Sequence, residues 1–275
     1  MPGISLWVCN IHLLTLFYCL YVNRYWSAVS LTLEPRLSTK WITNIAFFGN
    51  VISLPIPTAT FYLSGQLYNP TPPLLSTILE NVLPSVNTKK NLSKGLQSSC
   101  GLVQHCTALA LSKCLIKFQR VLKKFREIAV MLEEEQDGQW SRRCTEVESE
   151  MRKRVPDFMV VVAFGQQTQQ ASSKTTINQN KKALLAEIAQ RLLWLYHNCL
   201  PAVVSEARFD VGKILQNFAS TSNGEDTDDE HEPNTATRLH RVQQLHVLNI
   251  LRDSDQFTWA VKLGTFSQCS FFNNL

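Results

Sequence analysis

The residues of this sequence best suited to chemistry are cations gathered along one stretch. Lysine or arginine stands at positions 113, 117, 120 and 124, a spacing that places four cations on one side of a helix. No acid interrupts the run between residues 113 and 126. Such a row can neutralise phosphates of structured RNA without contacting the bases. It can also be a solvated face on which the aliphatic parts of the Lys and Arg side chains cover apolar surface. Both interpretations stay open. The candidate RNA-binding residues are Lys113, Lys117, Arg120, Lys123, Lys124 and Arg126, joined by Lys89, Lys90 and Lys94 from a polar loop expected at residues 85–100.

Catalytic motifs do not accompany this row. The sequence has no phosphate-binding glycine loop, no dinucleotide-binding glycine motif, no His-Glu-x-x-His and no nucleophile elbow. His105 and Cys106 are sequence neighbours and point to different sides of a helix, so they cannot share a tetrahedral metal site. His197 lies in an apolar helical pattern and suits a core position. We therefore predict a protein that is not an enzyme and has neither a metal site nor a cofactor.

The element that must position the cations is a long helix, predicted over residues 101–135. Apolar residues recur there with helical period on the side opposite the lysines. Acids at positions 133–135 lie where a helix dipole favours cations, and Asp137 with Gly138 forms a stop signal. We therefore expect the last turn of this helix to fray.

The rest of the chain has the pattern of further helices punctuated by prolines. The stretch after Pro156 could be a strand because of its β-branched residues, or a short buried helix. Charges of alternating sign at residues 142–154 predict an exposed, salt-bridged helix face. Helices are predicted near residues 41–52, 74–83, 140–154, 181–198, 201–218 and 238–252.

The composition and the order of the predicted helices along the chain together indicate the fold class. With 275 residues and 45% hydrophobic residues, the chain can bury one large core or two modest ones. Its net charge of +5 fits nucleic-acid contact without requiring it. Eight cysteines without a C-x-x-C pair suggest a reducing compartment, nucleus or cytosol. Because helix pairs recur at intervals of about 40 residues, we predict an all-α, irregular HEAT/armadillo-like α-solenoid of antiparallel helix pairs, with a globular helical bundle as the alternative.

Three regions are expected along the chain. Residues 1–30 contain an apolar helix at 5–22; polar residues interrupt it and no basic segment precedes it, so burial in protein is favoured while a membrane anchor stays open. Residues 31–260 form the helical-repeat domain, with disordered polar loops near 166–180 and 220–236. Residues 261–275 form an atypical tail, expected to be truncated.

Several blocks of sequence, in this order, carry a resemblance to a known family. They are KWITNIAFFGNVISLPIP at 40–57, PPLLSTILENVLPS at 72–85, the segment 93–115, RVPDFMVVVAF at 154–164, the segment 184–218 and LHVLNILRDSDQFTW at 245–259. Together they resemble the N-terminal region of the fungal nucleolar pre-ribosomal-associated protein 1 family, which are large helical-repeat proteins of 60S ribosomal subunit assembly. The family's members are several times longer than this chain, which would therefore be a slice of such a protein.

What this resemblance implies is a function without catalysis. The chain would belong to a scaffold of the nucleus and nucleolus that acts in early 60S assembly and pre-rRNA maturation. Its implied partners are pre-rRNA, small nucleolar RNA and early pre-60S assembly factors including a DEAD-box helicase, with no small-molecule substrate. The alternative is an α-solenoid for protein–protein interaction that makes no direct RNA contact.

Overall fold

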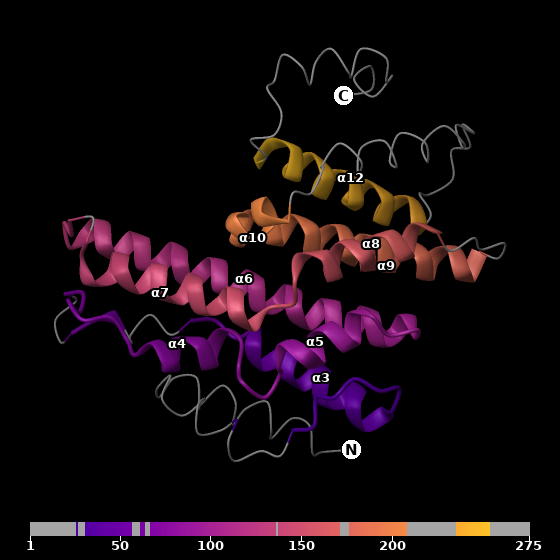
Figure 1. Ribbon diagram of the computed structural model, residues 1–275, viewed down its shortest axis with the longest axis horizontal. Helices are drawn as coiled ribbons and strands as arrows, with labels where there is room; N and C mark the ends of the chain where they lie inside the picture. Colours follow the sequence, from indigo (N-terminus) through magenta and orange to yellow (C-terminus); the bar gives the residue numbers. More distant parts are fainter. Residues whose placement is uncertain are drawn as a thin grey trace, which may run out of the picture. The chain divides into compact units, whose positions relative to one another are not determined.

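The computed structural model describes residues 26, 31–56, 61–63, 67–135, 137–170, 176–207 and 235–253. Over these ranges the regular elements are α-helices, and the single strand-like pairing is an antiparallel bridge between Tyr62 and Tyr68. The predicted all-α class is confirmed, with helices packed against one another as in helical-repeat folds (Figure 1). The chain divides into two compact units, Met1–Val160 and Val161–Leu275, where the sequence led us to expect one domain over residues 31–260.

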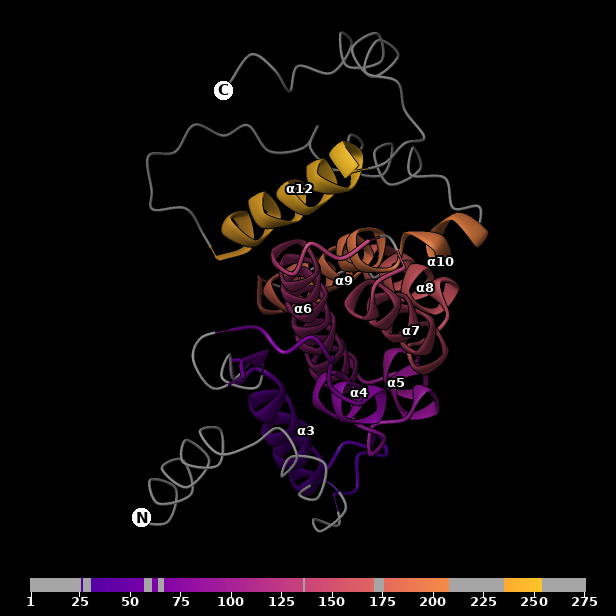
Figure 2. The same cartoon turned by 90° about the vertical axis from the view of Figure 1, so that its left-hand side faces the viewer.

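The N-terminal unit is built around the long helix α6 (Gly101–Met131), which lies antiparallel to α7 (Gln139–Arg154). Helices α3 (Thr39–Ile52), α4 (Leu75–Val82) and α5 (Lys89–Leu96) lie on one side of this pair (Figures 1 and 2). The apolar stripe of α6 faces inward as predicted: Leu111, Phe118 and Ile128 have no exposed surface. Because α6 contacts α3, α4, α5 and α7, it is the element on which the others in this unit pack.

The C-terminal end of α6 is a closed cap rather than the frayed turn that we expected. The Glu134 N–H donates to Ala129 O (3.0 Å) and the Glu133 N–H to Val130 O (3.1 Å), the two bonds of a Schellman motif. Glu133 takes the left-handed position of this motif, with φ of 52°. The Glu134 carboxylate then accepts hydrogen bonds from Trp140 N at 3.0 and 3.2 Å, so the acid predicted to disfavour the end of α6 caps the start of α7.

Helix α5 lies inside the stretch 85–100 that was predicted to be a polar loop, so that prediction was wrong. Thr88 caps the helix by accepting a hydrogen bond from Asn91 N at 3.2 Å. Leu92 and Leu96, four residues apart, point to one side and are fully buried. Two buried leucines and a good cap are enough to order a short, mostly polar helix when a neighbour such as α6 is present to cover it.

The C-terminal unit contains most of α8 (Phe158–Gln170), then α9 (Thr176–Cys199), α10 (Pro201–Glu206) and α12 (Thr235–Asp253). Helices α9 and α12 run in the same direction (Figure 1), because Gln243 contacts Ala183 and, further along both helices, His246 contacts Glu187. The sequence did not predict that these two helices pack against each other in parallel. The helices predicted near residues 181–198 and 238–252 are confirmed.

Polar sequence misled the prediction between α8 and α9. Residues 166–170 and 176–180 are helical, although a disordered loop was expected over 166–180. Gln has a good helix propensity, and Thr168 is buried with its hydroxyl donating to Gly165 O at 2.7 Å, so this segment continues the apolar helix before it. The stretch after Pro156, left open between strand and helix, is helical.

Some predictions fall outside the described residues: the apolar helix at 5–22, the disordered loop near 220–236 up to residue 234, the distal part of the helix expected at 201–218, and the tail at 261–275. Residues 235 and 236 of that predicted loop are the start of α12. None of the helices that the structure describes is long and apolar enough to cross a membrane.

Candidate nucleic-acid interface

The four cations with helical spacing lie on one side of α6, which we call the α6 row: Lys113, Lys117, Arg120 and Lys124. At its first member, the Lys113 side chain reaches α3, with Nζ 3.4 Å from Asn50 Oδ1. A Cβ added to Gly49 would lie 3.3 Å from Lys113 Cδ, so the absence of a side chain at Gly49 lets the lysine stem cross close to α3. The Lys113 ammonium is therefore held beside a neutral amide.

At the other end of the row, Lys124 contacts the bridge between Tyr62 and Tyr68. Its ammonium lies 3.3 Å from Tyr68 Oη, 3.3 Å from Glu127 Oε2 and 5.5 Å from the centre of the Tyr68 ring. Desolvation lowers the pKa of Lys124, but the hydrogen bonds to Tyr68 and Glu127 outweigh it, so the pKa lies above its ordinary value. Lys124 is thus a positively charged group placed against an aromatic ring.

The middle of the row is more open. Arg120 and its neighbour Lys123 are exposed, and neither forms an ion pair with an acid in the described part of the chain. Lys117 is partly exposed, one turn from Arg120. Arg120 and Lys123 are therefore the candidate cations on this part of α6 that are most accessible to a ligand.

Arg126, which the sequence analysis grouped with this row, lies elsewhere. Its guanidinium forms an ion pair with Glu148 of α7 at 2.8 Å. Thirteen residues separate Lys113 from Arg126, which at about 100° per residue is roughly 140° around the helix, away from the row. The helical geometry thus separates Arg126 from the α6 row, and Lys123 lies between the two.

The three lysines of α5 are also distributed rather than clustered. Lys89 pairs with Asp157 and Lys94 with Glu34, each at 2.6 Å, while Lys90 is exposed. The Lys94 ammonium lowers the pKa of Glu34 by hydrogen bonding and by its charge. Both ion pairs are solvent-exposed, so each contributes little to stability and could yield to a phosphate.

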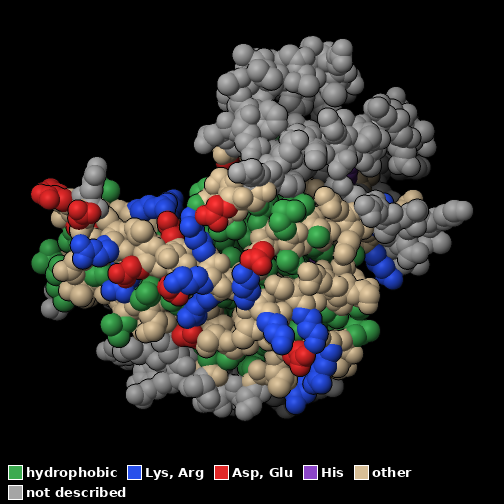
Figure 3. Space-filling view, in the orientation of Figure 1, with side chains coloured by type: hydrophobic (Ala, Val, Ile, Leu, Met, Phe, Trp, Pro, Cys, Tyr) green, Lys and Arg blue, Asp and Glu red, His purple; other side chains and the backbone are tan. Residues whose placement is uncertain are grey.

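Acids are interspersed with the cations elsewhere on the surface. In Figure 3 the Lys and Arg side chains on the visible face lie among Asp and Glu side chains instead of forming a continuous positive field. The α7 pairs Arg143–Glu146 at 3.2 Å and Lys153–Glu150 at 2.6 Å confirm the predicted salt-bridged face of that helix. The acid-free run between residues 113 and 126 is therefore the best candidate on this unit for binding an anionic polymer.

Tyr62 and Tyr68 also belong to this region, although the sequence did not predict it. Their rings stack with centroids 4.7 Å apart, and Tyr68 lies against Lys124. Tyr62 lies between Phe61 and Leu63, and Tyr68 follows Leu67, so these apolar runs are too short to show a period. The available signal was that two tyrosines lie six residues apart, a spacing that a hairpin can bring face to face.

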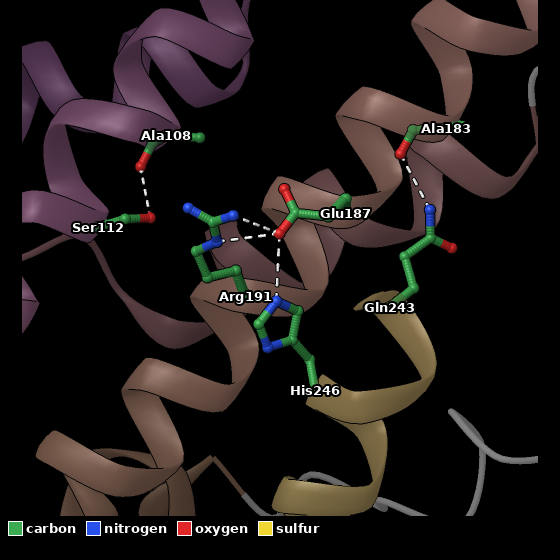
Figure 4. A network of polar contacts seen from close by, with 7 residues as sticks. All are labelled: Ala108, Ser112, Ala183, Glu187, Arg191, Gln243 and His246. Carbon is green, nitrogen blue, oxygen red and sulfur yellow. Dashed lines mark hydrogen bonds and ion pairs between the residues drawn. The ribbon is translucent and has the colours of Figure 1, made fainter. Parts of the chain in front are cut away.

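A separate polar network lies in the C-terminal unit (Figure 4). Glu187 Oε1 accepts hydrogen bonds from Arg191 at 2.6 and 2.9 Å and lies 3.1 Å from His246 Nε2. Gln243 Nε2 donates to Ala183 O at 2.9 Å, and the His246 ring stacks on Trp194. These contacts join α9 to α12 and are structural. The described residues include no group of three His, Cys, Asp or Glu side chains that could hold a metal ion.

Comparison with known proteins gives sequence relatives but no fold match. No family model matches the chain, and no solved structure matches it. The curated protein "Nucleolar pre-ribosomal-associated protein 1" of Saccharomyces cerevisiae is 26% identical over 132 residues, which is 47% of this chain and 7% of the yeast protein. The protein of the same name from Homo sapiens is 22% identical over 223 residues, covering 72% of this chain and 10% of the human protein.

The chain thus spans a tenth or less of the length of the curated relatives that it matches. The resemblance identified from the sequence blocks is confirmed: this chain is similar to a short part of the nucleolar pre-ribosomal-associated protein 1 of yeast and of human.

Proposed function

We propose that this chain is part of a non-catalytic scaffold that acts in the nucleolus during early assembly of the 60S ribosomal subunit and maturation of pre-rRNA. The observation that carries the proposal is its similarity to two proteins named as nucleolar and pre-ribosomal-associated. An all-α framework of packed helices, with polar networks that join helices, suits a scaffold. We also propose that the chain forms a helical-repeat region of a longer protein.

We further propose that the α6 row, together with Lys123, contacts RNA phosphates. Support comes from the exposure of Arg120 and Lys123 and from the lack of an acid between Lys113 and Arg126. Phosphate contacts of this kind position a protein on RNA without reading its sequence. Pre-rRNA and small nucleolar RNA are the proposed ligands, and early pre-60S factors including a DEAD-box helicase are the proposed protein partners.

Fluorescence anisotropy across a salt series tests the RNA contact, with the full chain and a structured rRNA fragment. The test variant carries Lys117→Gln, Arg120→Gln and Lys123→Gln. The matched control, Arg142→Gln with Arg152→Gln and Lys153→Gln, removes the same charge from exposed positions of α7. If the row binds phosphates, the test variant should flatten the slope of log affinity against log salt by about 2 to 3, and the control should leave the slope unchanged.

Two other outcomes would contradict the proposal in different ways. Equal slopes for the wild type and the test variant would assign the row to solvated surface. The alternative function, a protein-interaction solenoid without direct RNA contact, would then apply, and the chain should still co-purify with early pre-60S assembly factors after nuclease treatment. Failure to sediment with such particles before that treatment would overturn the assembly role itself.

A further inference from the structure

Tyr62 and Tyr68 are held face to face by the geometry of the antiparallel bridge. The flanking backbone hydrogen bonds run from Leu63 N to Leu67 O at 2.8 Å and from Asn69 N to Phe61 O at 2.9 Å. Tyr62 and Tyr68 are therefore a non-hydrogen-bonded pair, the register that brings cross-strand side chains closest. This explains why their centroids are 4.7 Å apart with ring planes inclined by only 21°.

The bridge is anchored to the core from its other side. Phe61 is buried, with its ring centroid 5.9 Å from Phe125 of α6 and 6.1 Å from Trp140 of α7. Trp140 Nε1 also donates a hydrogen bond to Asn69 O at 3.0 Å. Since side chains alternate along a strand, the burial of Phe61 directs Tyr62 outward. Contacts with α6 and α7 therefore hold the bridge that carries the two tyrosines in place.

Lys124 holds the hydroxyl end of the stacked tyrosine pair. Its ammonium lies 3.3 Å from Tyr68 Oη and 5.5 Å from the centre of the Tyr68 ring, on which Tyr62 stacks. The Tyr62 hydroxyl donates to Tyr68 Oη at 3.1 Å, which raises the pKa of Tyr62 and lowers that of Tyr68. Tyr62 is 37% exposed, and no third aromatic ring of the described residues stacks on it. The stacked pair therefore presents the ring of Tyr62 to solvent.

We propose that Tyr62 and Tyr68 form a stacking platform for an unpaired RNA base, with the α6 row binding the neighbouring phosphates. Aromatic rings beside a basic groove are how proteins bind single strands without sequence preference, because every base presents a flat face. Arg120 lies one turn of α6 from Lys124, about 6 Å along the axis, so phosphate and base contacts fall within reach of one nucleotide segment. This inference rests on the proposed RNA contact and specifies the form of the RNA, a single-stranded segment.

Two oligonucleotides with equal phosphate charge separate stacking from electrostatic attraction. We would measure binding of the full chain to an oligoadenylate of about a dozen nucleotides and to an abasic oligoribonucleotide of the same length. The wild type should prefer the oligoadenylate. Tyr62→Ala should weaken oligoadenylate binding by about 5- to 100-fold and remove that preference, without changing the salt slope. Tyr62→Phe keeps the ring, loses only the donated hydrogen bond and should retain the preference.

The outcomes distinguish this inference from the proposed function. If Tyr62→Ala binds oligoadenylate as tightly as the wild type does, or if the wild type binds both probes equally, the platform is wrong. The Lys117, Arg120 and Lys123 variant should weaken both probes alike. If that charge effect is seen and the Tyr62 effect is not, the phosphate contact stands without the platform. Circular dichroism of Tyr62→Ala and Tyr62→Phe confirms that both variants fold.

Discussion

At the scale of single residues, Gly138 has the least tolerance for a larger side chain at the connection between α6 and α7. Its φ of −59° is ordinary, so the constraint is one of space. A Cβ at this position would lie 2.6 Å from Glu134 Cβ and would also collide with the carboxylate that caps α7. The missing side chain at Gly138 therefore leaves the space that the Glu134 side chain occupies when it caps α7.

We expect Gly138→Ala to lower the free energy of unfolding by roughly 1–3 kcal/mol, because the Glu134 carboxylate must leave Trp140 N or the backbone must shift. Urea denaturation followed by tryptophan fluorescence would measure this. Gly165→Ala is the contrasting substitution. The new Cβ, inside α8, would meet Leu193 Cδ1 of α9 at 3.6 Å, an ordinary contact, so the substitution should be tolerated. If both variants lose the same free energy of unfolding, Gly138 is not specially constrained.

Helical spacing predicted part of the candidate site but not its neighbours. It correctly placed Lys113, Lys117, Arg120 and Lys124 on one side of α6, and the same arithmetic, carried to Arg126, would have moved that residue toward α7. Lys124 and Tyr68, which are in contact, lie 56 residues apart in the sequence. Their contact depends on the antiparallel bridge between Tyr62 and Tyr68, which no periodic pattern predicts. Local geometry is thus readable from spacing, whereas contacts between distant segments are not.

At the scale of elements, the sequence predicted the apolar helices and missed those ordered by a few buried residues. Helix α6 carries a long apolar stripe and is evident from periodicity alone. Helix α5 has only Leu92 and Leu96 in the core, and its polar residues suggested a loop. The parallel direction of α9 and α12 depends on which faces meet, and composition holds no information about that choice.

The packing of α9 against α12 should become less stable as the pH falls. Burial raises the pKa of Glu187, but His246 and Arg191 outweigh it, so the pKa lies below its ordinary value of 4.5. A carboxyl with a depressed pKa adds stability that is complete above its unfolded-state pKa and is lost as the pH falls through its folded-state pKa. The stability difference between the wild type and Glu187→Gln should therefore be largest near neutral pH and shrink below about pH 4.5.

Thermal unfolding at a series of pH values would measure that difference. Glu206→Gln, at an exposed position of α10 in the same unit, is the control and should change stability little at any pH. A difference for Glu187→Gln that persists unchanged at low pH would show that the loss comes from packing and not from the carboxylate charge.

At the scale of the whole molecule, the chain consists of two compact units joined within α8. Length and composition allowed either one large core or two modest ones, and could not choose between them because both bury similar apolar surface. The division follows from which helices contact which, and that is a property of the folded chain.

Two units should give two unfolding transitions in differential scanning calorimetry. Leu92→Ala removes a fully buried side chain from the N-terminal unit. It should lower the midpoint temperature of one transition, because the free energy of unfolding of that unit falls by about 2–5 kcal/mol. Glu187→Gln, in the C-terminal unit, should lower the midpoint temperature of the other transition. A single transition that both substitutions move together would mean that the units unfold as one.

The closed connection between α6 and α7 also bears on the order in which the N-terminal unit folds. The Schellman bonds and the Glu134 cap join residues only three to seven positions apart, so this turn costs little chain entropy to close and can form early. The ion pair between Lys89 and Asp157 joins residues 68 positions apart and must wait for both helices. The α6–α7 hairpin is therefore the natural nucleus of this unit, on which the helices that precede it in the chain dock afterwards.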